Sequence, residues 1–354
     1  MTAPVTLREA ADFLLARDNF LILSHRRPDG DTAGSCAALC RALRALGKRA
    51  WVYPNPQFTQ KFAHYLEGLV FEATGNGQQA TGDGGTDCHD QSADWSRNDK
   101  IGSDPQTFNF QLSTFNLISC DVASRSLLPF GMEDAAVELA LDHHGTNDGF
   151  AARTHADETK AACGEVILEL LPLLGAELTK EMAEALYVAI STDTGCFRYS
   201  NVTANTFRCA AACVEAGAEI FPINRAFFEI KRRPRLALEA YLIRTMEYFA
   251  DGRVAVSAIP EALMEELGLT EDDVDDISGF GRSIEGVELA VMLREVEGGK
   301  GKISLRSSPA FNAAAICARL GGGGHPGAAG ASVEGGIPAA REAILKAIGE
   351  EIEL

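Results

Sequence analysis

The sequence predicts an α/β protein of two domains, the first of them built on a doubly wound parallel sheet. The chain has 354 residues, which is long enough for two ordinary domains. In its first half, short apolar runs alternate with stretches whose apolar residues recur at helical spacing, and this alternation is typical of βαβ units. Hydrophobic residues make up 46% of the chain and charged residues 23%, so a wholly disordered protein is excluded.

The first domain, residues 1–220, begins with a predicted helix over 7–17 that Thr6 can cap. Uninterrupted apolar runs then predict strands, because the strands of a parallel sheet are buried on both faces. These strands cover residues 20–24, 49–53, 115–120 and 137–141. Further helices are predicted over residues 33–47, 162–175, 179–191 and 203–216.

A polar segment, residues 74–113, interrupts this domain. It is rich in Gly, Asp, Gln, Asn and Ser and nearly free of aliphatic residues, so it is predicted to be a surface insertion that buries little. Some of its polar side chains imitate a metal cluster, but a solvated loop is the preferred interpretation; they are Asp87, His89, Asp90 and Asp94. Trp95 is expected to anchor the loop.

Residues 221–250 are predicted to be a helical connector, which contains the basic segment KRRPR (231–235). Residues 251–354 are predicted to form a second, smaller α/β domain. Its strands are expected over 253–259, 287–296 and 302–307, and its helices over 260–268, 312–321 and 338–353.

Charge and cysteine content exclude several classes of protein. The formal net charge is −18 and the isoelectric point is near 4.8, which argues against a protein that coats long duplex nucleic acid. No run approaches the roughly 18 apolar residues of a membrane span, and the first residues do not resemble a signal peptide. The nine cysteines are scattered and contain no CxxC pair, so we expect a cytoplasmic protein without a disulfide framework.

In the first domain, aspartate and histidine residues come directly after four segments that are predicted to be strands. His25, Asp29 and Asp31 follow 20–24, Asp121 follows 115–120, Asp142, His143 and His144 follow 137–141, and Asp193 follows EALYVAIST (184–192). The carboxyl ends of parallel strands lie along one edge of an open sheet, so we expect these side chains to meet in one crevice.

So many carboxylates repel one another unless cations neutralise them. An oxygen and imidazole ligand set without thiolate suits Mn²⁺ or a similar divalent ion. The number of ligands is right for two ions that share a bridging carboxylate, and such a pair can clamp a phosphoryl group for in-line attack. Any one of these aspartates taken alone would be explained as a helix cap or turn former.

Four motifs of the first domain resemble those of the DHH phosphoesterases: HRRPDGD (25–31), ISCDVAS (118–124), LDHHGTN (141–147) and STDTGCFRYSN (191–201). Three segments of the second domain resemble the DHH-associated C-terminal domain of this family: RSIEGVELAVML (282–293), SLRS (304–307) and GGGGHPGAAGA (321–331). The resemblance spans almost the whole chain outside the insertion, and it is closest to the nanoRNase/pAp-phosphatase branch. It implies a metal-dependent phosphoesterase that hydrolyses short oligoribonucleotides to mononucleotides and 3′-phosphoadenosine 5′-phosphate to AMP, with the active site in the cleft between the domains.

The resemblance also implies a role for each residue. His25, Asp29 and Asp121 would hold one metal ion, and Asp31, Asp121, His143 and Asp193 the other. Asp142 would lie behind the ligands and orient an imidazole. His144 would face the scissile phosphate, either stabilising developing charge or acting as the acid for the leaving oxygen.

In the C-terminal domain, the glycine run is expected to leave backbone amides free for an anion, and basic side chains are expected to grip a terminal phosphate. The substrate-binding candidates are Arg282, Ser304, Arg306, Gly322, Gly323, Gly324 and His325, with Arg198 from the first domain.

Two alternatives to this function remain open. One is a phosphodiesterase of the same superfamily that acts on cyclic di-AMP or linear dinucleotides, with a pyrophosphatase less favoured; the other is a non-catalytic nucleotide sensor. The expected partners are short oligoribonucleotides and small phosphorylated nucleotides, without long duplex nucleic acid or a membrane. We leave a homodimer open.

Overall fold

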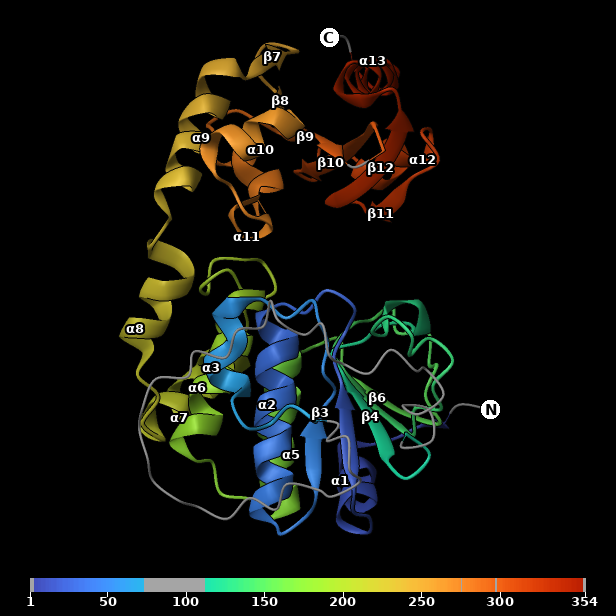
Figure 1. The fold of residues 1–354 in the computed structure, drawn as a ribbon, viewed down its shortest axis with the longest axis vertical. Helices are drawn as coiled ribbons and strands as arrows, with labels where there is room; N and C mark the ends of the chain where they lie inside the picture. Colours follow the sequence, from blue (N-terminus) through green and yellow to red (C-terminus); the bar gives the residue numbers. More distant parts are fainter. Residues whose placement is uncertain (1–2, 73–111, 275, 297, 353–354) are drawn as a thin grey trace. The chain divides into compact units, whose positions relative to one another are not determined.

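The structure is a computed structural model that describes residues 3–72, 112–274, 276–296 and 298–352. The chain divides into two compact units, Met1–Glu229 and Ile230–Leu354 (Figure 1). All but the last two residues of the polar insertion lie outside the described residues, and so do Asp87, His89, Asp90, Asp94 and Trp95.

The N-terminal unit is built on a six-stranded sheet in which every neighbouring pair is parallel. In spatial order its strands are β1 (Ala3–Pro4), β6 (Arg153–Ala156), β5 (Leu139–Asp142), β4 (Asn116–Cys120), β2 (Phe20–Leu23) and β3 (Ala50–Val52). This confirms the predicted parallel α/β class. The chain order reverses between β2 and β4, and in open α/β sheets ligands bind at this switch point, beyond the carboxyl ends of the strands.

Helices cover one face of this sheet: α1, α2 and α5 contact its strands, and α6 packs against α2 and α5 in the same core as strand residues such as Ile22 and Ile118 (Figure 1). Intervening strand residues such as Leu23 and Ala140 point to the other face, where Leu128 and other residues of connecting segments cover them. The helices are α1 (Leu7–Leu15), α2 (Gly30–Ala45), α3 (Ala63–Leu66), α5 (Cys163–Leu174), α6 (Lys180–Asp193), α7 (Ala204–Glu215) and α8 (Ile220–Asn224). Short 3₁₀ turns lie at Gln60–Phe62 and Arg125–Leu127, and a π turn lies at Arg225–Glu229.

Local sequence explains how two of these helices begin and pack. Thr6 caps α1 as predicted, in a capping box with Glu9. Helices α2 and α6 can lie in close contact because α2 has glycine where the two helices meet. A Cβ at Gly30 would collide with the Thr192 side chain, and one at Gly34 would collide with the Ala185 carbonyl. The two glycines therefore bring the start of α2 against the end of α6.

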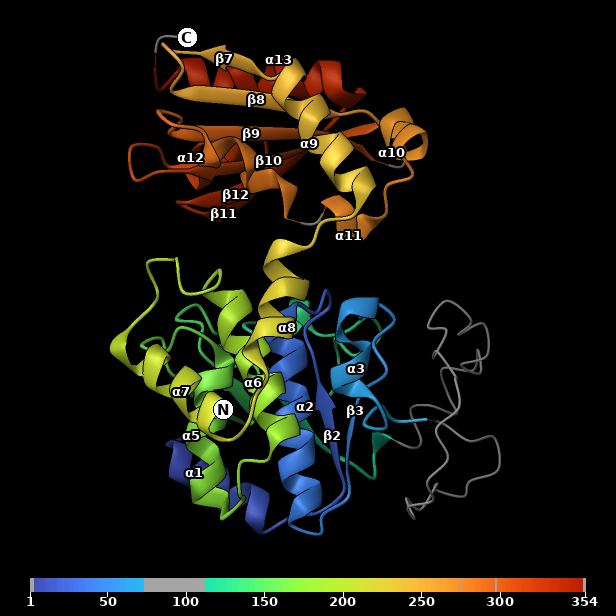
Figure 2. The same ribbon diagram turned by 90° about the vertical axis from the view of Figure 1, so that its left-hand side faces the viewer.

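The C-terminal unit has a second six-stranded sheet, whose strands lie one beside another in Figure 2. Its strands, in spatial order, are β11 (Gly323–His325), β12 (Ala328–Glu334), β10 (Lys300–Ser307), β9 (Leu289–Val296), β8 (Val254–Ile259) and β7 (Glu247–Phe249). All neighbours are antiparallel except β8 and β9. The predicted second α/β domain is thus confirmed.

Helices lie on both faces of the second sheet. Ile303 and Leu305 pack with residues of α12 (Ala313–Ala318) and α13 (Gly336–Gly349), whereas Met292 packs with residues of α9 (Arg233–Thr245) and α10 (Glu261–Leu267). The remaining elements are α11 (Glu271–Val274) and a 3₁₀ helix over Ile277–Ser283. No helix in the described parts of the chain is both long enough and apolar enough to cross a membrane.

The segment predicted as a continuous helical connector, 221–250, is broken. It contains the end of α8, the π turn and α9, and residues 247–249 form strand β7. The helical prediction is wrong at β7, because pairing of these residues with β8 overrides their local helical preference.

Candidate metal centre

The strand and helix ends predicted to carry chemistry do converge in the N-terminal unit. His25 follows β2, and Asp29 is the N-cap of α2, so its carboxylate accepts the Thr32 amide at 3.0 Å. Asp31 lies in the first turn of the same helix. Asp121 follows β4; Asp142 ends β5, with His143 and His144 next.

The sequence predicts residues 184–192 both as part of a helix over 179–191 and as a strand before Asp193. The helix is confirmed and the strand is wrong, because EALYVAIST belongs to helix α6 and Asp193 is its last residue. The run is apolar on nearly every face because α6 packs against α2, α5 and α7. A helix buried all round loses its amphipathic pattern and resembles a buried strand in sequence. The carboxylate nevertheless reaches the same site, since α6 packs closely on α2.

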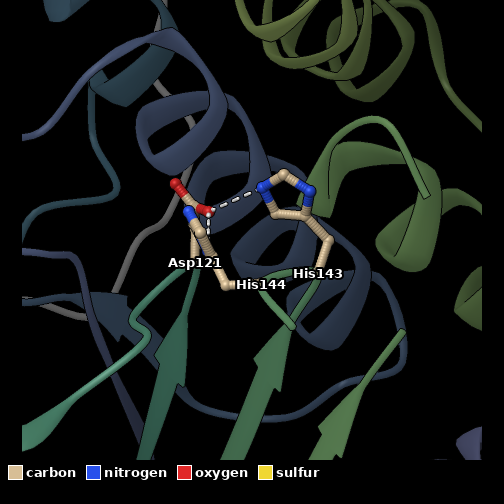
Figure 3. A group of neighbouring side chains, drawn as sticks. All are labelled: Asp121, His143 and His144. Carbon is tan, nitrogen blue, oxygen red and sulfur yellow. Dashed lines mark ion pairs between the residues drawn. The ribbon is translucent and has the colours of Figure 1, made fainter. Parts of the chain in front are cut away.

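Asp121 is the centre of the cluster (Figure 3). Its Oδ1 lies 3.5 Å from Nε2 of His143 and 3.6 Å from Nδ1 of His144, and its Oδ2 lies 3.8 Å from Nε2 of His25. Thr32 Oγ1 donates to Oδ2 at 2.6 Å, but Oδ1 is buried without a hydrogen-bond partner among the described residues. Its φ of 61° is in the left-handed region, a conformation that strains residues other than glycine and is concentrated at functional sites.

Three overlapping groups of side chains could each hold a metal ion: His25, Asp29 and Asp121; Asp31, His143 and Asp193; and Asp121, His143 and His144. In the second group, Nε2 of His143 lies 3.6 Å from Asp31 and 3.7 Å from Asp193. Carboxylate oxygens and imidazole nitrogens are suitable ligands for a divalent cation, and the orphaned oxygen of Asp121 gives such an ion a ligand atom that the protein leaves unused.

The electrostatics of the cluster favour a cation. Burial, together with the charges of Asp121 and Asp193, raises the pKa of Asp31 well above its ordinary value. Burial and the charge of Asp121 also raise the pKa of Asp193 to about 6, against the opposing effect of His143. Although burial alone would lower the pKa of His143, its interaction with the Asp121 carboxylate and the charges of Asp31 and Asp193 raise it to about 10. Burial and mutual repulsion therefore disfavour the ionised carboxylates Asp31 and Asp193, and a bound cation would offset both effects.

Backbone groups of one segment, residues 157–164, support two of these ligands. The amides of Cys163 and Gly164, at the start of α5, donate to the Asp31 carboxylate at 2.6 and 2.9 Å. Nδ1 of His143 lies 3.2 Å from the carbonyl oxygen of Lys160. Since a carbonyl only accepts, Nδ1 carries the proton and Nε2 is left as the ligand atom.

Asp142 is fully buried and is held by four donors. Its Oδ1 accepts from Nδ1 of His144 at 2.8 Å and from the amides of His143 and His144, and its Oδ2 accepts from Asn147 at 2.6 Å. Burial opposes the charge, but these hydrogen bonds lower the pKa of Asp142. The hydrogen bond between Asp142 and Nδ1 of His144 also raises the pKa of His144, whose side chain is 42% exposed.

In the C-terminal unit, the register of the strands brings Arg306 and His325 to one face of the sheet. Both residues are paired with Ala328, from β10 and β11 respectively. The next row places Ser304 and Gly323 opposite Gly330. Residues directly opposite in antiparallel strands share a face, so these candidates gather there, away from the buried face formed by neighbours such as Leu305.

The glycine run differs from the sequence-based expectation. Its last residues form edge strand β11, and the amides of Gly321 and Gly322 donate to carbonyls of α12 at 3.1 and 2.9 Å, so the expectation of free amides is wrong for these two. A Cβ at Gly322 would collide with the Gly330 carbonyl, and Gly324 has a φ of 145° and lies against Ala328. Packing against β12 therefore requires glycine at 322 and 324, whereas the Cβ position of Gly323 has no neighbour within 4 Å.

The remaining two candidates each have a backbone partner. Arg282 lies in the 3₁₀ helix, and its guanidinium donates to the Val287 carbonyl. Arg198 follows Asp193 on the loop after α6, and its Nε donates to the Gly195 carbonyl at 2.5 Å. The cleft between the domains stays a prediction.

Several functional contacts were missed in the sequence. Thr32 and Asn147 lie next to or within the recognised motifs, so a search for hydroxyl and amide donors beside the ligands could have found them. The contributions of Lys160, Cys163 and Gly164 come from the backbone and have no sequence signal.

Comparison with known proteins agrees with this architecture. The model of the DHH family N-terminal domain matches residues 19–190, and that of the DHHA1 domain matches residues 251–354. Two proteins named bifunctional oligoribonuclease and PAP phosphatase NrnA are similar to this chain along most of their length. That of Thermus thermophilus is 31% identical over 98% of this chain and 94% of its own, and that of Bacillus subtilis is 24% identical over 89% and 90%.

A solved structure shows the same fold. An exopolyphosphatase-related protein from Bacteroides fragilis superposes with a TM-score of 0.81 and 22% identity, over 97% of this chain and 96% of that one. The chain belongs to the DHH family of phosphoesterase hydrolases, in the branch of the bifunctional oligoribonucleases and PAP phosphatases.

Proposed function

We propose that the protein is a two-metal-ion phosphoesterase that hydrolyses short oligoribonucleotides to mononucleotides and 3′-phosphoadenosine 5′-phosphate to AMP. The position of Asp121 carries this proposal. Its two carboxylate oxygens face different ligand groups, Oδ2 toward His25 and Oδ1 toward His143. One carboxylate shared in this way is what a pair of neighbouring metal ions requires.

In this proposal His25, Asp29 and Asp121 hold one ion, and Asp31, Asp121, His143 and Asp193 hold the other. The mixed oxygen and nitrogen ligand set favours Mn²⁺. When bound, two divalent ions neutralise charge on the transferred phosphoryl group and activate water as the nucleophile at neutral pH.

In this proposal His144 faces the scissile phosphate. Its Nδ1 is hydrogen-bonded to Asp142 at 2.8 Å, so Nε2 carries a proton only in the cationic imidazolium form. The raised pKa of His144 favours that form near neutral pH. Nε2 can then stabilise the charge that develops on the phosphate or protonate the leaving oxygen.

In this proposal the nucleotide binds to the face of the C-terminal sheet that carries Arg306, Ser304 and His325. Arg306, Ser304 and His325 share that face, and a guanidinium can bind a terminal phosphate through two parallel hydrogen bonds. Gly323 lies in the same cross-strand arrangement with open space above its Cα, so the substrate can approach the backbone there. Arg198 and Arg282 are further phosphate contacts in this proposal.

The basic segment KRRPR (231–235) does not favour long substrates, because cations of this segment pair with carboxylates of the C-terminal unit. Lys231 pairs with Glu239 at 2.8 Å, Arg232 with Asp273 at 2.5 Å, and Arg235 with Asp276 at 2.5 Å. These cations are neutralised by protein carboxylates, and the chain as a whole carries a net charge of −18. A long polyanion therefore gains little from this segment.

Relatives that share almost the full length of the chain support the choice of substrates, since the names of those from Thermus thermophilus and Bacillus subtilis give both activities. The test is a substrate panel of a diribonucleotide, 3′-phosphoadenosine 5′-phosphate, cyclic di-AMP and pyrophosphate, each with Mn²⁺, Mg²⁺ and a chelator. We expect turnover of the first two, dependent on metal and abolished by the chelator. Selective turnover of cyclic di-AMP or pyrophosphate would replace this proposal, and binding without turnover would favour the sensor.

A further inference from the structure

The Asn201 side chain joins the two parts of the chain that carry the second ligand group. Its Nδ2 donates to the carbonyl oxygen of Ala161 at 3.1 Å and to that of Asp193 at 3.1 Å. A primary amide has two N–H groups, so these hydrogen bonds use both. One side chain thus links the end of α6 to segment 157–164.

Segment 157–164 is sensitive to the position of Ala161. Directly before it, the Lys160 carbonyl fixes Nδ1 of His143; shortly after it, the amides of Cys163 and Gly164 bind the Asp31 carboxylate. A displaced Ala161 carbonyl would shift both supports. Asn201 therefore connects all three side chains of the second ligand group through the backbone.

The loop that brings Asn201 back to Asp193 has an unfavourable backbone conformation. Gly195, Cys196 and Phe197 have successive φ values of 56°, 58° and 62°. The left-handed region is disfavoured for residues with a Cβ, and it persists only where surrounding contacts hold it. The two hydrogen bonds of Asn201 are such contacts, because they hold the loop against the end of α6 and against segment 157–164.

We propose that Asn201 is a positioning residue for the second metal ion, setting the separation between Asp193 and the Asp31–His143 pair without contacting the ion itself. This inference rests on the two-ion centre of the proposed function. It is distinct from a general contribution to folding, because loss of the Asn201 bonds should loosen one ion and leave the other, held by His25, Asp29 and Asp121, in place.

Asn116 provides a matched control. Its Nδ2 also donates to a backbone carbonyl, that of Asp18 at 2.5 Å, but it stands at the start of β4, at the opposite end of the strand from Asp121. Asn116→Ala therefore removes an amide-to-carbonyl hydrogen bond without touching the ligands.

The experiment is a calorimetric titration of metal-free protein with Mn²⁺, together with thermal unfolding of the same samples. The experiment compares Asn201→Ala and Asn201→Asp with wild type and with the control Asn116→Ala. Two further variants serve as references: Asp29→Asn for loss of the first ion and Asp193→Asn for loss of the second. We expect both Asn201 variants to weaken one ion by about 10- to 100-fold, the usual effect of removing a residue that supports a metal ligand. The affinity pattern should match that of Asp193→Asn and not that of Asp29→Asn, with a melting temperature close to that of Asn116→Ala.

Wild-type affinity for both ions in the Asn201 variants would overturn the inference, and so would equal weakening of both ions. If Asn201→Ala does not fold, Asn201→Ser, which keeps one donor, is judged by the same criteria. Failure of the proposed function is seen separately, since it would show as wild-type protein that binds two ions yet hydrolyses none of the panel. Wild-type protein that binds a single ion would overturn both.

Discussion

Asp142 and His144 form a hydrogen-bonded pair in which a fully buried carboxylate orients a partly exposed imidazole. Oδ1 of Asp142 lies 2.8 Å from Nδ1 of His144, and the carboxylate is held on its other side by Asn147. The hydrogen bond assigns the proton of Nδ1, and it raises the pKa of His144. In the proposed function, this leaves Nε2 of His144 to face the substrate.

This pair predicts the pH dependence of activity. The cationic form of His144 is present below its pKa, so activity that depends on it falls as the pH rises through that pKa. Asp142→Asn removes the charge that helps raise the pKa, so the fall should move to lower pH. The measurement is kcat/KM on 3′-phosphoadenosine 5′-phosphate against pH at saturating Mn²⁺. His144→Ala should lose about 10²- to 10⁴-fold and show no such limb; an unchanged profile in Asp142→Asn would contradict the role of the pair.

Replacing the shared carboxylate should remove the chemistry without unfolding the protein. We expect Asp121→Ala to abolish turnover and reduce bound metal, because both ligand groups lose an oxygen. The metal-free variant should remain folded, since the substitution also removes one of several buried carboxylates that repel one another. Metal content by atomic emission and thermal unfolding measure the two effects. Near-normal hydrolysis would exclude Asp121 as a bridge, and Asp31→Asn should damage the second site more than the first.

Metal binding should release protons. Since the pKa of His143 in the metal-free protein is about 10, its ligand nitrogen is protonated at neutral pH and must lose that proton to bind a metal ion. Apparent affinity for Mn²⁺ should therefore rise with pH between about 6 and 9, by up to tenfold per unit for each proton released. Titrations in two buffers of different ionisation enthalpy count the protons. His143→Gln should release fewer, and proton-independent binding in wild type would contradict this electrostatic assignment.

Arg306 should matter for nucleotides and not for phosphate chemistry. Arg306→Ala is expected to lower kcat/KM on a diribonucleotide by about 10- to 100-fold, the effect of losing a charged hydrogen bond of about 1.5–3 kcal/mol. Hydrolysis of a small activated phosphodiester should change little, because remote binding energy is not used there. Arg341→Ala, which breaks an ion pair with Glu247 on another part of the unit, is the control. Equal losses on both substrates would place Arg306 at the reacting phosphate.

Chain-length dependence tests whether KRRPR acts as an RNA track. We expect kcat/KM to peak at roughly two to five nucleotides and to fall for longer RNA, because only a few phosphates can be neutralised by the candidate site. Arg232→Ala should lower stability, through loss of its bond to the buried Asp273, and leave the length profile unchanged. Assays on a ladder of oligoribonucleotides at fixed salt measure this. Activity that rises up to tens of nucleotides, and falls in Arg232→Ala, would contradict the assignment.

The sequence by itself determined the fold class, and it predicted the side chains that the structure brings together in the candidate metal centre. Continuous apolar runs such as 20–24 and 115–120 predict buried parallel strands, and the carboxyl ends of such strands lie at one edge of the sheet. Side chains that directly follow these runs, such as His25 and Asp121, could therefore be placed together without coordinates. Periodicity reports burial, however, and it gave both a helix over 179–191 and a strand over 184–192 where the structure has α6, because a helix buried on all sides has no polar face.

Only the tertiary structure decided which groups hold those side chains in position. The hydrogen bond from the Cys163 amide to Asp31 joins residues 132 positions apart, and the one from Thr32 to Asp121 joins residues 89 positions apart. The glycine run became strand β11 by pairing with β12, which local sequence does not specify. Backbone donors are the same at every residue, so their partners depend on which segments the packed core brings together, and no local pattern in the chain encodes that choice.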